Sequence, residues 1–128
     1  MLELQVMTIL SYKDLIVWQK AMQLVEEVYK LTSQFPQSEL YELSAQMRSS
    51  VASIPSNIAE GRKLGSKKEF RKFLRIAFGS GAELETQVEI AKRLSFGKTL
   101  NYKAVDALLD EVMRMLNTMI KNMHDPVS

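Results

Sequence analysis

The sequence contains no cysteine and only one histidine, His124, and this shortage removes several classes of chemistry. Without cysteine the chain can form no disulfide, zinc–thiolate centre or thiol nucleophile. With a single histidine near the C-terminus, a serine nucleophile has no candidate base, and the Glu-x-x-His pairs that hold di-iron centres in helical bundles are missing. We therefore expect no catalytic residues, no metal site and no cofactor, and we expect that the protein is not an enzyme.

Glycine and proline are also scarce, with five and three residues, which favours long regular elements over many turns. No stretch is apolar over enough residues to span a bilayer, and residues 1–10 lack the basic region and cleavage site of a signal peptide. The absence of cysteine suits a reducing compartment. We expect a cytoplasmic protein without membrane contact, with an N-terminal arm at 1–12, one domain at 13–124 and a tail at 125–128.

The apolar residues that are present recur with the period of an α-helix in four segments. The first segment, which ends near Pro36, carries two adjacent apolar seams, and its apolar face is therefore wider than a bundle interior requires. One seam consists of Leu15, Trp18, Met22, Val25 and Tyr29, and the other consists of Val17, Ala21, Leu24, Val28 and Leu31. The surplus seam predicts that the protein associates with itself.

The second segment, about 38–60, mixes apolar residues with many small ones and has Pro55 in its interior. Proline removes one backbone hydrogen bond and should kink the helix. Asn57 and Glu60 are placed to bond the backbone groups that this frees. Gly61 is predicted to end the helix.

Ser66 and Glu69 form a capping box at the start of the third helix, which is predicted to end near Gly97. Its heptad seam consists of Phe70, Leu74, Ala77, Gly81, Leu84, Val88 and Ala91. Gly79 and Gly81 each cost about 1 kcal/mol against alanine inside a helix, so we expect another part of the chain to pack closely against both.

A fourth helix follows Asn101, which can cap it, and its apolar seam runs from Val105 to Met123. The short connections make sequential helices antiparallel neighbours. We therefore predict an all-α fold, an antiparallel up-down-up-down four-helix bundle. A three-helix arrangement and a domain-swapped dimer are the alternatives.

Positive charge is concentrated around the predicted turn between the second and third helices. Residues 48–75 include eight basic and two acidic residues, whereas the rest of the chain has nine basic and thirteen acidic residues. The basic residues that surround and follow this turn are Arg62, Lys63, Lys67, Lys68, Arg71, Lys72 and Arg75. We call this set the basic stripe.

Most of the basic stripe lies on the outward side of the third helix and crowds its first turns. The helix dipole disfavours cations at that end, and the free backbone N–H groups there favour an anion. A phosphate backbone supplies such an anion, so the basic stripe is the predicted nucleic-acid-binding surface. The alternative is a surface that serves only solubility, which suits Arg62 and Lys63 because cations near a helix C-terminus are stabilised.

Several local sequences become distinctive when they are taken together. They are Ser-Ile-Pro-Ser-Asn-Ile-Ala-Glu-Gly at 53–61, Leu-Ile-Val-Trp-Gln-Lys-Ala at 15–21, Phe35-Pro36 with Glu39 and Tyr41, Gln46 with Arg48, Phe-Leu-Arg-Ile-Ala at 73–77, and Gly79-Ser80 with Glu83-Leu84-Glu85. With these motifs, which cover about 12–123, the chain resembles the family of 23S rRNA intervening-sequence proteins. A related group comprises the accessory variability proteins of diversity-generating retroelements.

The resemblance implies a four-helix bundle, a homo-oligomer with a pentamer as the expected form, and contact with RNA or DNA. It also implies a protein partner, either a reverse transcriptase or a ribosomal component. The leading hypothesis is thus a non-enzymatic oligomeric adaptor that binds nucleic acid through the basic stripe. The second hypothesis is a protein-interaction module in which the basic stripe meets Glu83, Glu85 and Glu89, predicted to be a solvated acidic face, on a neighbouring subunit.

Overall fold

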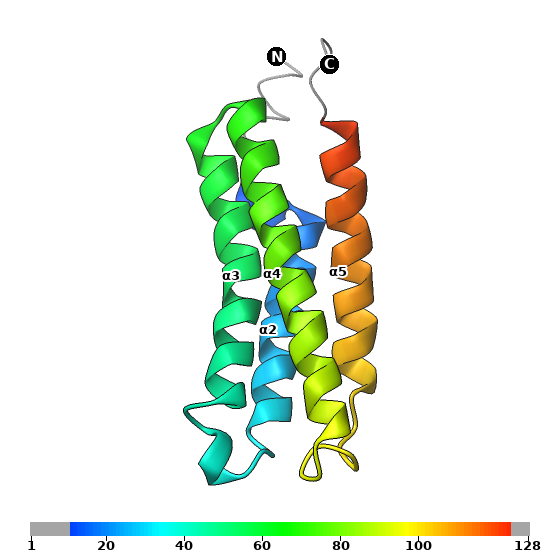
Figure 1. Cartoon of the computed structure of the whole chain (residues 1–128). Coiled ribbons are helices and arrows are strands. Elements are labelled where there is room, and N and C mark those ends of the chain that lie inside the picture. The colour runs from blue at the N-terminus through cyan, green and yellow to red at the C-terminus, as the bar shows by residue number, and fades with distance from the viewer. Residues whose placement is uncertain (1–10, 124–128) are drawn as a thin grey trace.

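A computed structural model describes residues 11–123 of the chain, and every regular element in that range is helical (Figure 1). Two short 3₁₀ helices, η1 (Tyr12–Asp14) and η2 (Gln37–Glu39), accompany four α-helices. These are α2 (Ile16–Thr32), α3 (Leu43–Leu64), α4 (Lys67–Arg93) and α5 (Lys103–Asn122). The predicted all-α class is confirmed. The arm at 1–10, His124 and the tail at 125–128 lie outside the described residues.

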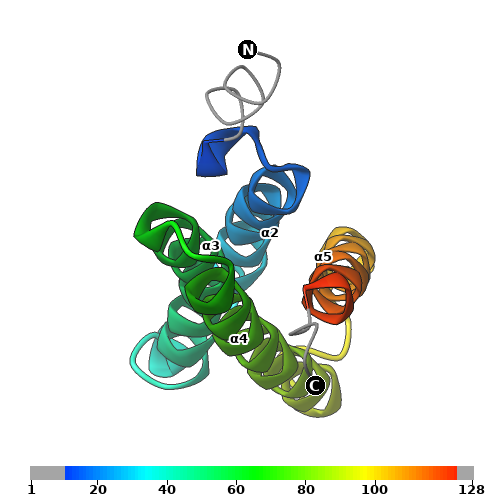
Figure 2. The same cartoon turned by 90° about the horizontal axis from the view of Figure 1, so that it is seen from above.

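The four α-helices form a bundle in which each helix runs in the opposite direction to the one before it (Figure 1). The contact between α3 and α4 is the most extensive, while α2 packs on α3 and α5, and α5 also packs on α4. Figure 2 shows this arrangement of the four helices from above. None of the helices in residues 11–123 is long and apolar enough to cross a membrane.

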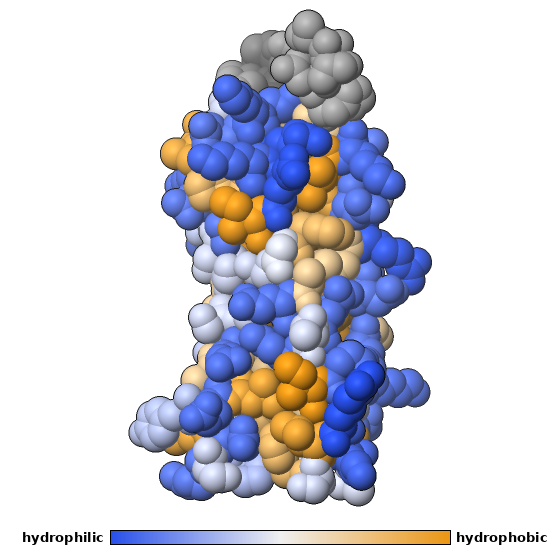
Figure 3. Space-filling model, viewed as in Figure 1, coloured by the Kyte–Doolittle hydropathy of each residue, from blue (hydrophilic) through white to orange (hydrophobic). Residues whose placement is uncertain are grey.

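The core of the bundle uses only one of the two apolar seams of α2. The seam that begins at Val17 is buried throughout. The other seam lies at the edge of the core, where Met22 and Tyr29 are 39% and 44% exposed. Ile76, Ile90 and Leu94 of α4 are exposed as well, and Figure 3 shows apolar patches among polar side chains on one face of the bundle. Sequence periodicity alone does not distinguish the two seams, because both have the helical period.

The prediction that Gly61 ends the second helix is wrong. Gly61 is buried inside α3, which continues to Leu64 and ends at Gly65, a residue in the left-handed conformation with φ of 85°. A Cβ at Gly61 would lie 2.6 Å from Phe73 Cβ and 3.3 Å from Phe70 Cα. Gly61 therefore allows the backbones of α3 and α4 to approach each other. In the sequence, a glycine with this packing role cannot be distinguished from one that ends a helix.

Pro55 is buried within α3 and leaves the helix continuous. Because proline has no N–H, it cannot donate to the carbonyl of Val51. Asn57 Nδ2 donates to Ser53 O at 2.8 Å and to Ser53 Oγ at 2.9 Å, so Asn57 bonds the backbone of this turn, but not at the carbonyl that the proline frees. The expected bond from Glu60 is not formed within the described residues.

The start of α4 agrees with its predicted cap, since Ser66 Oγ accepts a hydrogen bond from Glu69 N at 3.0 Å. The heptad seam of α4 is buried from Leu74 onwards. A Cβ at Gly81 would overlap Met113 Sδ of α5, which confirms the predicted close approach. At Gly79 the prediction is wrong, because no other part of the chain within residues 11–123 comes within 4 Å of its Cβ position.

The connection between α4 and α5 begins earlier than predicted, since α4 ends at Arg93 rather than near Gly97. Asn101 contributes to the start of α5 by accepting a hydrogen bond from Lys103 N at 2.9 Å, although Tyr102 occupies the N-cap position. Tyr102 is buried and donates its hydroxyl hydrogen to Gly97 O at 2.8 Å, which ties the connection to the bundle.

Candidate nucleic-acid interface

The basic stripe lies around the turn between α3 and α4, at the same end of the bundle as the start of α2 and the end of α5 (Figure 1). Its exposed members are Lys63, Lys67, Lys68, Lys72 and Arg75, whereas Arg62 and Arg71 are half-buried. We call this part of the molecule the basic end. The structure thus brings the last turn of α3 and the first turns of α4 together, as their closeness in sequence requires.

The exposed members of the basic stripe are not used in ion pairs within residues 11–123. Elsewhere on the bundle, Lys20, Lys30, Lys92 and Arg114 each pair with a carboxylate. Among the described residues, no such pair involves the five exposed cations of the basic stripe. The one interaction found for them in this range is that of Lys72 Nζ, which lies 5.8 Å from the centre of the Phe73 ring. Their charge is therefore not neutralised by neighbouring carboxylates.

Arg71 departs from its predicted role. Its Nε donates to Ile120 O at 3.1 Å, which places the guanidinium at the C-terminal end of α5. Cations are stabilised there by the helix dipole and by the last carbonyls of the helix. The expectation that Arg71 simply faces solvent is thus wrong, because this side chain connects α4 to α5.

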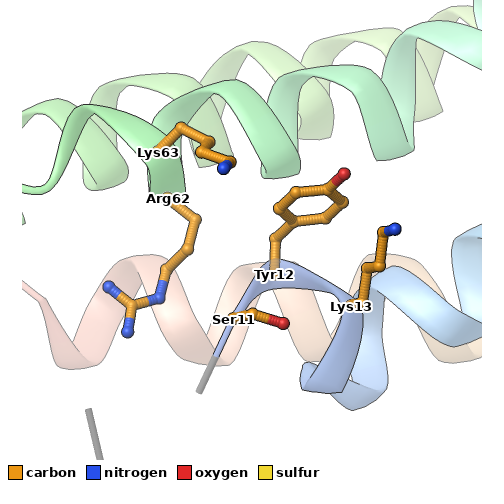
Figure 4. Close-up of a pocket in the computed structure, with 5 residues that line it drawn as sticks. All are labelled: Ser11, Tyr12, Lys13, Arg62 and Lys63. Atoms are coloured by element: carbon orange, nitrogen blue, oxygen red, sulfur yellow. The ribbon is translucent and has the colours of Figure 1, made fainter. Parts of the chain in front are cut away.

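A cleft at the basic end adds residues that the sequence pattern did not reveal. It has a volume of about 450 Å³ and is lined by Ser11, Tyr12, Lys13, Arg62 and Lys63 (Figure 4). Figure 4 shows the Lys63 side chain extending toward the Tyr12 ring, with the Arg62 guanidinium on the other side of Ser11. The cleft forms because η1 packs against α3 as well as α2.

Local interactions at η1 fix the position of Tyr12 in this cleft. Ser11 N donates to Asp14 Oδ2 at 3.3 Å, which closes the turn. The Tyr12 and Trp18 rings meet edge to face, with their centres 5.4 Å apart and an angle of 70° between their planes. The pairing of Ser11 with Asp14 is visible in the sequence, but the pairing of η1 with the far end of α3 is a tertiary contact that periodicity cannot predict.

A second hollow adjoins the cleft and shares Arg62 with it. It measures about 230 Å³ and is lined by Arg62, Gly65, Ser66, Lys67, Phe70 and Met123. The α3–α4 turn and the end of α5 therefore meet in a concavity that contains two cations and one aromatic ring. Through Arg62, the basic surface continues from the cleft onto the start of α4.

The three acidic residues predicted to form one face are divided by the structure. All three are exposed, but Glu83 accepts a hydrogen bond from Ser50 Oγ of α3 at 3.1 Å. Glu85 and Glu89 instead line a hollow of about 340 Å³ between α4 and α5, together with Asp106 and Asp110. We call it the acidic hollow.

Lys92 lies in the acidic hollow and is held by its carboxylates. Its Nζ is 2.8 Å from Asp106 Oδ2 and 3.4 Å from Glu89 Oε1. The hydrogen bond to Asp106 is the main cause that raises the pKa of Lys92. Across residues 11–123, no group of three or more histidine, cysteine or carboxylate side chains is arranged to hold a metal ion.

Comparisons with known proteins agree with this architecture. A family model described as 23S rRNA-intervening sequence protein matches residues 13–118. No curated protein matches the chain. The fold is similar to that of a crystal structure from Bacteroides thetaiotaomicron, described as a protein with unknown function from the S23 ribosomal protein family. The TM-score is 0.69 at 22% sequence identity, over 83% of this chain and 99% of that chain, and this likeness concerns the fold alone.

Proposed function

The chain belongs to the family of 23S rRNA-intervening sequence proteins, and from this premise we propose that it is a non-enzymatic, homo-oligomeric adaptor that binds RNA or DNA at its basic end. One observation carries the proposal: the exposed cations of the basic stripe have no carboxylate partner in residues 11–123. Lys67 and Lys68 lie in the first turn of α4, where the dipole disfavours them. These lysines destabilise the end of the helix where they lie, which supports a role in binding an anion outside the chain.

The expected mode of binding is electrostatic. Each phosphate that the basic stripe neutralises releases counterions, so affinity should fall steeply as salt increases. Contacts to phosphate position a nucleic acid but do not read its sequence, so little sequence selectivity is expected from the basic stripe.

Self-association and a protein partner belong to the same proposal. The seam of α2 that begins at Leu15, which we call the outward seam, leaves Met22 and Tyr29 exposed. Ile16 on the same helix is 56% exposed. A second copy of the chain can cover such residues, and a pentameric ring would repeat the basic end and increase avidity for a long polyanion. A reverse transcriptase or a ribosomal component is the proposed protein partner, and we propose no membrane contact.

A second candidate function is a protein-interaction module without nucleic acid. The acidic hollow favours it, because four carboxylates, those of Glu85, Glu89, Asp106 and Asp110, gather there. Within residues 11–123 the cations that pair with them are Lys92, with Glu89 and Asp106, and Arg114, with Asp110. The basic end of one subunit would complement the acidic hollow of another. In the adaptor, phosphates of a nucleic acid neutralise the basic stripe, whereas in the interaction module carboxylates of a neighbouring subunit do so.

Fluorescence anisotropy with labelled RNA and duplex DNA, at low and moderate salt, tests the adaptor. The informative variant reverses Lys67, Lys68 and Lys72 to Glu and keeps Arg71, which holds α5. Its control reverses Arg93, Lys98 and Lys103, which are exposed at the opposite end and lack ion pairs in the described range, so the net charge changes equally. The adaptor requires that only the first variant loses binding while circular dichroism stays unchanged. An absence of binding by the parent at low salt would favour the interaction module.

A further inference from the structure

The cleft and the second hollow at the basic end combine cations with an aromatic ring in concave sites. We propose that the nucleic-acid site takes a single strand rather than a duplex, with Tyr12 as an aromatic contact for a base and Lys13 as an added phosphate contact. This inference rests on the proposed function and adds to it the class of nucleic acid and two residues outside the basic stripe.

The dimensions and chemistry of the cleft suit one nucleotide. A volume of about 450 Å³ lies within the range of sites that enclose a small ligand. A single strand can place one unpaired nucleotide in such a cleft, whereas the nucleotides of a duplex are paired and stacked inside it. Lys13 from η1 and Lys63 from α3 both line it, which provides positive charge from two elements. Among the described residues, no carboxylate lines the cleft, and the nearby Asp14 carboxylate accepts hydrogen bonds from Ser11.

Tyr12 is a preorganised contact. Its ring is half-buried and is held against Trp18, so little side-chain freedom remains to be lost when a base packs on it. Stacking on aromatic rings is available to single strands because their bases are not enclosed in a helix. Duplex bases lack this freedom, and a phosphate backbone alone gains little from an aromatic ring.

The path between the two hollows also favours a flexible chain. Arg62 lines both, so a polyanion that follows the positive charge passes from Lys13 around the end of α3 to Lys67 and Phe70 on α4. A duplex resists bending on this scale, with a persistence length of about 50 nm. A single strand can turn around the end of one helix, with a base at Tyr12 and its phosphates near Arg62 and Lys67.

The test compares labelled single strands of about 16 nucleotides with duplexes of the same length and sequence, by anisotropy at low salt. We expect the full-length protein to bind the single strand about tenfold more tightly. Tyr12→Leu should weaken single-strand binding about tenfold and leave duplex binding unchanged, whereas Tyr12→Phe keeps the ring and the affinity. Tyr41→Leu, at an 88% exposed tyrosine outside the cleft, is the matched control.

The chain has its own reporter for the cleft. Trp18 is the only tryptophan, and its ring centre lies 5.4 Å from that of Tyr12, so occupancy of the cleft should change its emission. We expect the unlabelled single strand to change Trp18 emission and the duplex to leave it unaltered. Lys13→Glu should weaken single-strand binding, and Lys98→Glu, the same charge change at a distant exposed site, should not.

The outcomes separate the two proposals. Equal affinity for single strand and duplex, with Trp18 emission unchanged and Tyr12→Leu like the parent, overturns the single-strand inference and leaves the adaptor standing. No binding of either nucleic acid by the parent at low salt overturns both. If Tyr12→Leu does not fold, the parent's Trp18 emission together with Lys13→Glu and Tyr12→Phe decides the question.

Discussion

Three glycines in α3 and α4 occupy different environments, so the same added methyl group should have opposite effects on stability. The Cβ position of Gly79 has no described residue packed within 4 Å of it, so Gly79→Ala should raise the free energy of unfolding by about 0.5–1 kcal/mol. At Gly61 the new Cβ would meet Phe73 Cβ at 2.6 Å and the backbone of Phe70, so Gly61→Ala should lower it. Urea denaturation of both variants checks the signs, and a stabilising Gly61→Ala would contradict the close approach of α3 and α4.

Gly81 provides an intermediate case. The atoms that a Cβ would meet belong to the flexible end of Met113, so alanine can be partly accommodated there. A leucine cannot, and Gly81→Leu should destabilise the fold by roughly 1–3 kcal/mol or more through overpacking. A melting temperature at or above that of the parent would show that this contact is looser than the geometry indicates.

Gln87 of α4 is a polar residue placed where an apolar one would fit. Its side chain is only 7% exposed, and its Oε1 is buried without a hydrogen-bond partner among the described residues. An unsatisfied buried acceptor is destabilising, and a methionine of similar length removes it. Gln87→Met should raise the free energy of unfolding by about 1 kcal/mol in urea denaturation. A loss of stability would indicate that this oxygen has a partner in solution.

The first turn of α4 places stability and the proposed binding in opposition. Carboxylates suit a helix N-terminus, so Lys67→Glu with Lys68→Glu should keep or raise the melting temperature, by the equivalent of about 0.3–1 kcal/mol for each charge. The same change should weaken nucleic-acid binding, since both side chains are exposed and unpaired within residues 11–123. Differential scanning calorimetry and anisotropy on one sample measure both effects. A variant that loses stability and binding together would point to a structural role for these lysines.

At the level of elements, periodicity predicted what depends on a single helix. The Ser66 side-chain cap, the heptad seam of α4 and the class of the fold follow from local preferences, and they are confirmed. The other half of the predicted capping box, in which Ser66 N donates to the Glu69 carboxylate, is not formed within residues 11–123. What failed depends on contacts between helices. Gly61 and Gly65 look alike as helix stops in the sequence, but Phe70 and Phe73 of α4 pack against Gly61, whereas Gly65 adopts the left-handed conformation that ends α3.

The same distinction applies to the candidate site across the whole molecule. The exposed part of the basic stripe was visible in the sequence because one turn places its residues together. Tyr12 and Lys13 were missed because they reach Arg62 and Lys63 only through the packing of η1 on α3. Arg71 was misjudged for the same reason, since its acceptor, Ile120 O, lies on another helix. Helical angles specify which way a residue points, but not which neighbour it meets.

The outward seam of α2 predicts that the whole molecule associates with copies of itself. The core uses the seam that starts at Val17, so Met22 and Tyr29 of the other seam remain at the surface, where Met22 is 39% exposed. Because exposed apolar area is stabilised when a second copy covers it, light scattering at micromolar concentration should give a mass several times 14.6 kDa. Met22→Glu should lower that mass, whereas Gln23→Glu, at the neighbouring exposed residue of α2, should not. A parent that scatters as a monomer would remove self-association from the proposed function, and avidity could then not strengthen the phosphate contacts of a single basic end.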